Sequence, residues 1–309
     1  MKNEITSPEI DWEKILAPIS ADRPAGEFLI YEGVYDEIKQ ARREDNATLD
    51  QGIWETNLKK AQWDKVEFIC LETLTFRSKD LQIAAWLLES WIHLYGFPGV
   101  RVGLELLRRL SQEFWEQVFP IDEGDDLEAR IAPFDWLDEK LSIKLKLAPV
   151  LKEGRDGISY RYSDWELASR NENQIRKGSL KVQEGDEKHL TQNLFLTNCK
   201  WAPQGFFPKE REVLEGALEN LEALGQFLDD KCGKNSPSLR HFGNTLKSIL
   251  RLVTDIIKYR GETVLALPTQ MVKEDAPMED ENIAEKNTQE VMKKAYQGNI
   301  SSREEAYQI

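Results

Sequence analysis

The stretch LQIAAWLLESWIHLYG, residues 81–96, decides the fold of this 309-residue chain. Its apolar side chains recur three and four residues apart, the spacing that places them on one face of an α-helix. The positions concerned are Leu81, Ala84, Ala85, Leu88, Ile92 and Tyr95. Gly96 follows directly, where glycine commonly ends a helix. The stretch therefore predicts a helix that buries one face in a hydrophobic core.

Similar helices are predicted on both sides of this one. One covers residues 63–76 and is separated from it by the short polar break Ser78–Asp80; another covers about 100–118 and is stopped by Pro120. Their apolar faces comprise Val66, Ile69, Cys70 and Leu74 in the first, and Leu104, Leu107 and Phe114 in the second. Helices joined by such short turns pack as antiparallel neighbours. The order predicts a helical bundle or a set of helical hairpins, without a repeat of fixed period.

Two further segments complete this first region. Val34, Ile38 and Ala41 form the apolar stripe of a helix that ends at Arg42 and Arg43, where cations suit the negative end of the helix dipole. Downstream, LEARIAPFDWLDEKL (127–141) is predicted to be helical, with Asp125 or Asp126 as its N-cap and with Pro133 splitting or kinking it.

The second half of the chain predicts a long helical hairpin. Its first helix follows Pro208 and ends before Gly233, and its second opens at Ser236–Pro237 as N-cap and first helical residue. Their apolar faces comprise Leu214, Ala217, Leu218, Leu221, Leu224 and Leu228, then Phe242, Leu246, Ile249, Val253, Ile256 and Ile257. Before them, SDWE (163–166) is a capping box that starts a helix, and NENQIRKGSLKVQEGDEK (171–188) is predicted to be a loop. The predicted fold class is all-α.

Four parts are predicted along the chain. Residues 1–148 form the N-terminal helical domain and 149–262 a middle helical region. Residues 263–290 are acidic and poor in large apolar residues, which predicts a flexible linker. Residues 291–309 contain capping-box pairs, Ser301 with Glu304 or Ser302 with Glu305, that announce a helix, yet the chain stops within two turns. We therefore expect 291–309 to begin a truncated C-terminal domain.

Composition bounds the possible partners. The chain has 55 acidic and 41 basic residues, a net charge of −14, which argues against nucleic acid, since that partner requires clustered Lys and Arg. No apolar run approaches the ~18 residues that a membrane span requires, so no membrane insertion is expected. The three cysteines are odd in number and far apart, which suits a reducing compartment. The predicted location is cytoplasmic.

No motif in the sequence assigns a reaction. CGKNSPS (232–238) lacks the upstream glycine and the hydroxyl after Lys234 that a phosphate loop requires. Histidines and cysteines never stand at metal-ligand spacing, and DEGDDLE (122–128) lacks the ligand pattern of a calcium loop. His93 is interpreted as a packing or hydrogen-bonded histidine. The prediction is therefore a protein that is not an enzyme, with no catalytic residue, cofactor or metal site.

The stretch RREDNATLDQGIWETNLKKAQWD, residues 42–64, supplies the candidate binding residues Arg42, Arg43, Asp45 and Trp54. Arginine and tryptophan are over-represented at the energetic centres of protein interfaces. The competing interpretation is structural: the arginines end a helix, and the tryptophans pack a long loop onto the bundle. We favour the structural interpretation, because loops of this length need aromatic anchors to stay ordered.

Several blocks of the sequence resemble one family in order, over about residues 15–145. They are ILAPISADRPAGEFLIYEGVYDEIKQARRED, LDQGIWE, KKAQWDKV, SKDLQIAAWLLESW, GFPGVRVGLELLRRLSQEFWEQVFP and DLEARIAPFDWLDEKL. Together they resemble the ImpA-type N-terminal domain that begins the TssA subunits of bacterial type VI secretion systems. The end, NISSREEAYQI, resembles the opening of the C-terminal domain of the shorter TssA proteins.

The resemblance implies a cytoplasmic assembly protein without enzymatic activity. Its implied partners are baseplate components and the tube and sheath proteins whose assembly such subunits promote. Self-association would reside in the C-terminal region that is missing here. The alternative function is a cytoplasmic helical-repeat adaptor that holds a peptide or partner protein in a groove. A symmetric oligomer that binds baseplate proteins favours the first function, and a single tight peptide ligand favours the second.

Overall fold

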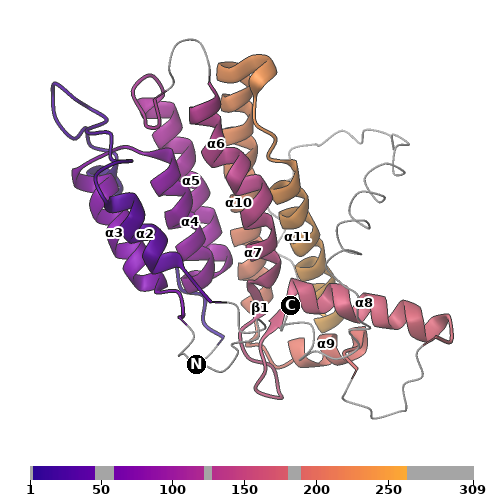
Figure 1. The fold of residues 1–309 in the computed structure, drawn as a ribbon. Coiled ribbons are helices and arrows are strands. Elements are labelled where there is room, and N and C mark those ends of the chain that lie inside the picture. The colour runs from indigo at the N-terminus through magenta and orange to yellow at the C-terminus, as the bar shows by residue number, and fades with distance from the viewer. Residues whose placement is uncertain (1–2, 46–58, 122–126, 180–188, 263–309) are drawn as a thin grey trace, which may run out of the picture.

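The computed structural model describes residues 3–45, 59–121, 127–179 and 189–262 (Figure 1). The elements, in chain order, are α1 (Trp12–Ile15), α2 (Val34–Arg42), α3 (Trp63–Phe76), α4 (Leu81–Tyr95), α5 (Phe97–Phe114), α6 (Glu128–Trp136), the π-helix η1 (Leu137–Leu141), α7 (Ser142–Leu147), β1 (Pro149–Leu151), β2 (Tyr160–Arg161), α8 (Tyr162–Arg176), α9 (Gln192–Cys199), α10 (Phe206–Cys232), the 3-10 turn η2 (Gly233–Asn235) and α11 (Arg240–Arg260). The all-α class is confirmed. The short antiparallel pair β1–β2 is an addition that the sequence did not predict.

Helix α4 lies at the centre of the first region and contacts α3, α5, α6 and α7. Its start is fixed by Asp80, whose Oδ1 accepts the N–H groups of Gln82 at 2.8 Å and Ile83 at 3.0 Å. Gly96, with φ +71°, ends it and lets α5 return antiparallel. The predicted helix and its Gly96 terminus are therefore confirmed. The buried surface of α4 extends beyond the single predicted face, because α4 has neighbouring helices on several sides.

Two glycines of α5 allow α4 and α5 to approach closely. A Cβ at Gly99 would lie 2.2 Å from the carbonyl oxygen of Trp91 in α4, and one at Gly103 would lie 2.5 Å from Leu88 Cδ1. A methyl group fits at neither position. The sequence of α5 is therefore constrained by its neighbour as well as by its own helical pattern.

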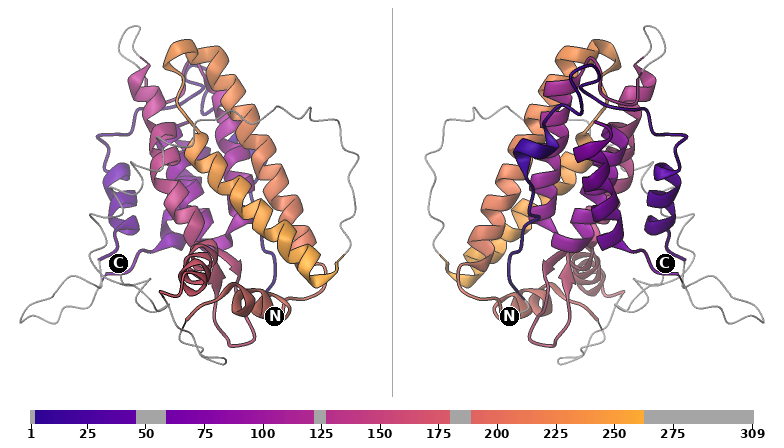
Figure 2. Two further views of the ribbon diagram at one scale, coloured as in Figure 1. Left: turned by 90° about the vertical axis from the view of Figure 1, so that its right-hand side faces the viewer. Right: turned by 90° about the vertical axis from the view of Figure 1, so that its left-hand side faces the viewer.

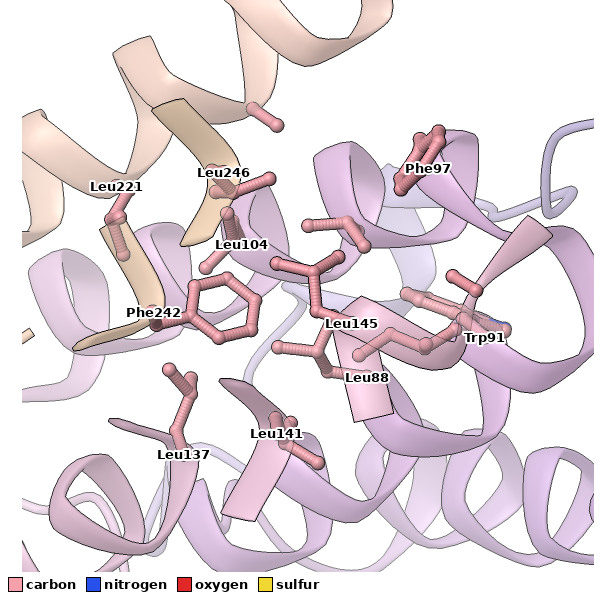
Figure 3. Close-up of a cluster of buried hydrophobic side chains, with 14 of the residues drawn as sticks. Leu88, Trp91, Phe97, Leu104, Leu137, Leu141, Leu145, Leu221, Phe242 and Leu246 are labelled. Carbon is pink, nitrogen blue, oxygen red and sulfur yellow. The ribbon is translucent and has the colours of Figure 1, made fainter. Parts of the chain in front are cut away.

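Helices α10 and α11 form the predicted antiparallel hairpin, and α10 packs along α5 (Figure 2). One buried cluster joins both halves of the chain. Figure 3 shows Leu88 of α4 beside Leu145 of α7, with Phe97 of α5 on one side of the cluster and Leu221 and Phe242 of the hairpin on the other. The predicted division at residues 148/149 stays a prediction, and one continuous core crosses it.

Three local expectations differ from the structure. Helix α11 begins at Arg240 rather than beside Pro237, and Asp138 of η1 caps it by accepting the Phe242 N–H at 2.7 Å. At the start of α8, Asp164 Oδ2 accepts the Arg161 N–H at 2.8 Å, so the N-cap is Arg161, two residues before the predicted Ser163.

The third difference is the length of α8. It continues through Arg176, within the segment predicted to be a loop. Its Asn171 is buried and donates to the carbonyl of Leu190, which ties this polar stretch to the start of α9.

Pro133 lies inside α6, and the chain changes to a π-helix over 137–141 before the α-helical conformation resumes in α7. The proposed caps Asp125 and Asp126 and the parts 263–290 and 291–309 lie outside the described residues.

Candidate protein-binding surface

Arg42, at the end of α2, is a structural residue. Its Nε donates to Glu89 Oε2 of α4 at 2.6 Å, and the Glu89 side chain is only 5% exposed. The guanidinium also lies over two indole rings, 5.2 Å from the ring centroid of Trp86 and 5.1 Å from that of Trp136. Arg42 thereby ties α2 to α4 and α6.

Arg43 and Asp45 lie next to each other at the surface, with Arg43 Nη2 3.4 Å from Asp45 Oδ1. Asp45 also pairs with Lys59, at the other end of the segment 46–58. Its N–H donates to the Lys59 carbonyl at 2.9 Å, and its Oδ2 accepts the Lys59 N–H at 3.0 Å. Trp54 lies outside the described residues. The structure thus brings Arg43 and Asp45 together, and a binding role for this group stays a prediction.

His93 of α4 packs face to face with Trp63, with ring centroids 4.0 Å apart and planes 6° apart. Burial lowers the pKa of His93 to about 4, and the nearby Lys144 and Arg42 act in the same direction. His93 is therefore neutral at physiological pH. This is the packing role that the sequence suggested for it.

The segment Ser78–Asp80, which the sequence presented as a simple break, is a buried junction. Lys79 is fully buried, and its Nζ donates to the carbonyls of Ile15 at 2.6 Å and Leu74 at 2.8 Å. Burial lowers the pKa of Lys79 to about 8. Asp80 is also fully buried, and this burial raises its pKa; the Tyr35 hydroxyl, which donates to Asp80 Oδ2 at 2.8 Å, acts in the opposite direction. The junction joins α2, α3 and α4 to the N-terminal segment.

The same junction fixes residues 25–29 along its outer side. The Lys79 N–H donates to the Ala25 carbonyl at 2.8 Å, and the Glu27 N–H donates to the Arg77 carbonyl at 3.0 Å. Gly26 has φ +81°, and a Cβ there would lie 2.1 Å from the Arg77 carbonyl oxygen. Leu29 is completely buried. These contacts leave the segment little freedom to move.

Large apolar side chains point outward from this fixed segment. Tyr31 is 89% exposed, Phe28 43% and Ile30 40%. Ile121, two residues after Phe119, is 51% exposed. The ring of Phe28 contacts those of Tyr31 and Phe119, with centroid separations of 6.1 and 5.5 Å. We call Phe28, Ile30, Tyr31 and Ile121 the Phe28–Tyr31 patch.

Charged groups border the Phe28–Tyr31 patch. A shallow hollow beside it is lined by Arg23, Gly26, Glu27, Phe28, Glu32 and Phe119. An exposed aromatic group on a rigid backbone, with a charged rim, is the composition of a protein interface. The sequence signal was the run FLIY at residues 28–31, of which only Leu29 is used in the core.

The described residues offer little for other chemistry. In these ranges no three His, Cys, Asp or Glu side chains gather as a metal ion would require. Burial raises the pKa of the Cys70 thiol, and that of Cys199 to about 12, so neither forms a thiolate near neutral pH. Among the helices that the structure describes, none has the length and apolar character needed to cross a bilayer.

Comparison with known proteins gives three concordant matches. Residues 16–139 match the family model described as ImpA, N-terminal, type VI secretion system. The chain is 31% identical over 118 residues to the type VI secretion system component TssA1 of Pseudomonas aeruginosa, a match that covers 38% of this chain and 33% of that protein. The chain thus spans about a third of the length of that relative.

The third match is to a solved structure. It is the N-terminal domain, including the conserved ImpA_N region, of the TssA component of the type VI secretion system from Burkholderia cenocepacia. The two structures superpose with a TM-score of 0.70 at 25% sequence identity, over 83% of this chain and 97% of that one. The solved structure therefore has the same fold across most of the described residues. The whole Phe28–Tyr31 patch lies inside the segment that matches the family model.

Proposed function

We propose that this chain carries an ImpA-type N-terminal domain of the type VI secretion TssA family and that it is a non-enzymatic assembly subunit, a proposal supported by the family-model match over residues 16–139 and by the two similar TssA proteins. In this role it binds baseplate components and promotes assembly of the tube and sheath. Self-association through the C-terminal region, from residue 291 onward, belongs to the same proposal. We assign the contact with a baseplate protein to the Phe28–Tyr31 patch.

The observation that carries the proposal is the rigid exposure of Tyr31 and Phe28. Binding normally costs the ordering of side chains and loops at the interface, so a segment already fixed by Lys79, Gly26 and Leu29 loses less entropy. Aromatic side chains contribute large apolar contact area with few rotatable bonds. An exposed tyrosine on such a frame is well suited to anchor a partner.

Replacement of Tyr31 tests this assignment. Tyr31→Ala should weaken binding to the cognate baseplate protein by roughly tenfold or more, the effect expected of an aromatic hot spot. Each purified baseplate protein is titrated against this chain by biolayer interferometry. The matched control is Phe68→Ala, because Phe68 is a 65% exposed aromatic on α3, away from the patch. Equal affinities of the Tyr31→Ala and Phe68→Ala proteins for the baseplate protein would reject the assignment of this contact to the Phe28–Tyr31 patch.

Self-association is tested separately by light scattering. This chain and a version extended beyond residue 309 through a TssA C-terminal domain are compared. A large closed oligomer formed only by the extended version supports the assembly subunit. Identical oligomer sizes of the two versions would favour the adaptor function instead.

One observation favours the adaptor as a second candidate. A groove runs between α10 and α11, and Gly225 has no neighbouring atom within 4 Å of where its Cβ would be. Leu218, Leu221 and Gly243 line the same groove. Gly225→Trp should fill it and abolish capture of a peptide ligand while leaving baseplate binding unchanged. Peptide-library selection against the natural chain and against the Gly225→Trp variant distinguishes the two functions.

A further inference from the structure

A second exposed surface lies at the end of the molecule where α9 meets the last turn of α11 (Figure 2). It consists of Arg155, Ile158, Lys200, Trp201 and Tyr259, which we call the Trp201 surface. Trp201 is 57% exposed, Ile158 44% and Tyr259 39%. All five residues lie outside the segment 16–139 that matches the family model.

Two polar clamps hold the backbone beneath the Trp201 surface. Asn198 Oδ1 accepts the Arg155 N–H at 2.9 Å, which joins α9 to the loop between β1 and β2. On the other side, the Arg260 guanidinium donates to the carbonyls of Cys199 and Ala202, the latter at 2.9 Å. Arg260 also pairs with Glu262 at 2.6 Å, with both side chains mostly buried. The turn that carries Lys200 and Trp201 is therefore fixed from both sides.

The two cations of this surface lie over its two aromatic rings. The Arg155 guanidinium carbon lies 5.2 Å from the Trp201 ring centroid, and Lys200 Nζ lies 4.5 Å from that of Tyr259. Within the described ranges neither cation forms an ion pair with a carboxylate. The neighbouring Asp156 accepts from Tyr160 and from the Ile158 N–H instead. Two unneutralised cations beside exposed apolar rings, in a chain of net charge −14, fit an acidic ligand that also carries apolar side chains.

We propose that the Trp201 surface binds the acidic segment of this same chain, Glu274–Glu285. That segment contains six carboxylates and no cation, together with the apolar residues Met278 and Ile283. The described chain ends at Glu262, which Arg260 holds next to the Trp201 surface. The twelve steps from Glu262 to Glu274 span up to about 40 Å when extended, and about 20 Å on average if the chain is flexible. The segment is therefore within reach.

The tether makes modest attraction sufficient for binding. A linker of this length places the acidic segment at an effective concentration on the order of millimolar. Attraction between exposed charges extends over a Debye length of about 8 Å at physiological ionic strength and weakens at higher salt. Occupancy of the Trp201 surface by the chain's own segment would exclude acidic segments of other proteins. Binding here does not depend on the Phe28–Tyr31 patch.

Photo-crosslinking in the full chain tests the proposal. Ile158 is replaced with p-benzoyl-L-phenylalanine, the protein is irradiated, and the cross-linked peptides are mapped by mass spectrometry. The expected products join position 158 to residues 274–285, and their yield should fall at least fivefold in 0.5 M NaCl, since screening weakens exposed charge pairs. Irradiation of a mixture of ¹⁴N and ¹⁵N protein separates products within one chain from products between chains.

Charge variants identify the contacts. Arg155→Glu with Lys200→Glu should lower the crosslink yield at least fivefold. The matched control, Lys60→Glu with Lys234→Glu, makes the same change in net charge at two exposed lysines elsewhere and should leave the yield unchanged. A third variant removes three of the six carboxylates of the segment, through Glu279→Gln, Asp280→Asn and Glu281→Gln, all of which lie outside the described fold. It should lower the yield as strongly as the reversal at Arg155 and Lys200.

Three outcomes would overturn the proposal. The first is a crosslink from position 158 to other parts of the chain only. The second is a product of mixed isotopic composition, which would place the acidic segment on a second copy. The third is a yield that does not change when Glu279, Asp280 and Glu281 are neutralised.

Discussion

At the scale of single residues, the buried charges show what the local sequence pattern could not reveal. Ser78–Asp80 has the composition of a solvent-exposed break, yet Lys79 and Asp80 are fully buried. Their partners Ile15 and Tyr35 lie 64 and 45 residues away in sequence, so no local rule connects them. Arg42 is similar: the sequence predicted that it ends a helix, but it could not predict that its partner is Glu89, 47 residues away.

Loss of Arg42 should be far more destabilising than loss of Arg43. Arg42→Ala leaves Glu89 buried without its partner, which typically costs about 3–5 kcal/mol. Arg43→Ala removes only an exposed pair and should change stability by less than about 0.5 kcal/mol. Urea unfolding of both variants measures the difference. Comparable losses from the two replacements would contradict a buried structural role for Arg42.

Lys79 should give the chain a stability that rises with pH above neutrality. Burial lowers the pKa of its amine from 10.5 to about 8 in the folded protein. Between these values the unfolded chain binds more protons than the folded one, so folding becomes more favourable as pH rises. Below about pH 8 the buried amine is charged in both states, and this gain is absent.

The comparison with Lys79→Met isolates this contribution, since methionine has similar length and no charge. Urea unfolding is measured for both proteins at several pH values from 7.5 to 10.5. The free energy of unfolding of the natural chain, minus that of Lys79→Met, should increase across this range. A difference that stays constant or decreases would show that the Lys79 pKa is not lowered.

At the scale of elements, prediction succeeded where a helix is specified by its own residues. Helices α3 and α4 occupy the ranges that their apolar spacing and Gly96 indicated. Prediction failed where a distant group supplies the cap or the burial, as Asp138 does for α11 and Leu190 for α8. Likewise, the site prediction included exposed Arg43 but passed over Phe28 and Tyr31, because exposure depends on the packing of the whole segment.

Two glycine-to-alanine replacements within helices should have opposite signs. Alanine is intrinsically better than glycine in a helix by about 0.5–1 kcal/mol. Gly225→Ala in α10 should therefore stabilise the protein by roughly that amount, since its Cβ position is open. Gly99→Ala in α5 should destabilise it by about 2 kcal/mol or more, because the added methyl collides with the Trp91 carbonyl. Thermal melts by circular dichroism give both signs; a stabilising Gly99→Ala would mean that α4 and α5 separate easily.

At the scale of the whole molecule, the continuous core links the two predicted regions. Leu88 and Leu104 of the first helices share one buried cluster with Leu221 and Leu246 of the hairpin (Figure 3). A cluster that crosses residue 148 makes independent unfolding of either side costly, since each side would expose apolar surface. The chain up to Glu262 should therefore behave as one cooperative unit.

Hydrogen exchange tests this expectation. Leu221→Ala in α10 removes a side chain from the shared cluster and should destabilise the protein by about 2–5 kcal/mol. The slowest amides of α4, in the other predicted region, should lose protection by the same free energy as those of α10. Protection of α4 that survives while α10 is exposed would divide the chain into two folding units at or near residue 148.

The backbone pair between Asp45 and Lys59 has a practical consequence for labelling the protein. Because the two residues are joined directly, the ends of the segment 46–58 are held together whatever its length. Lengthening a loop between fixed ends costs only about 0.6 kcal/mol per doubling. An epitope tag or a small fluorescent reporter inserted between Asp45 and Lys59 should leave the Phe28–Tyr31 patch and the Trp201 surface intact. Such an insertion would let this protein be followed in living cells with both chain termini unmodified.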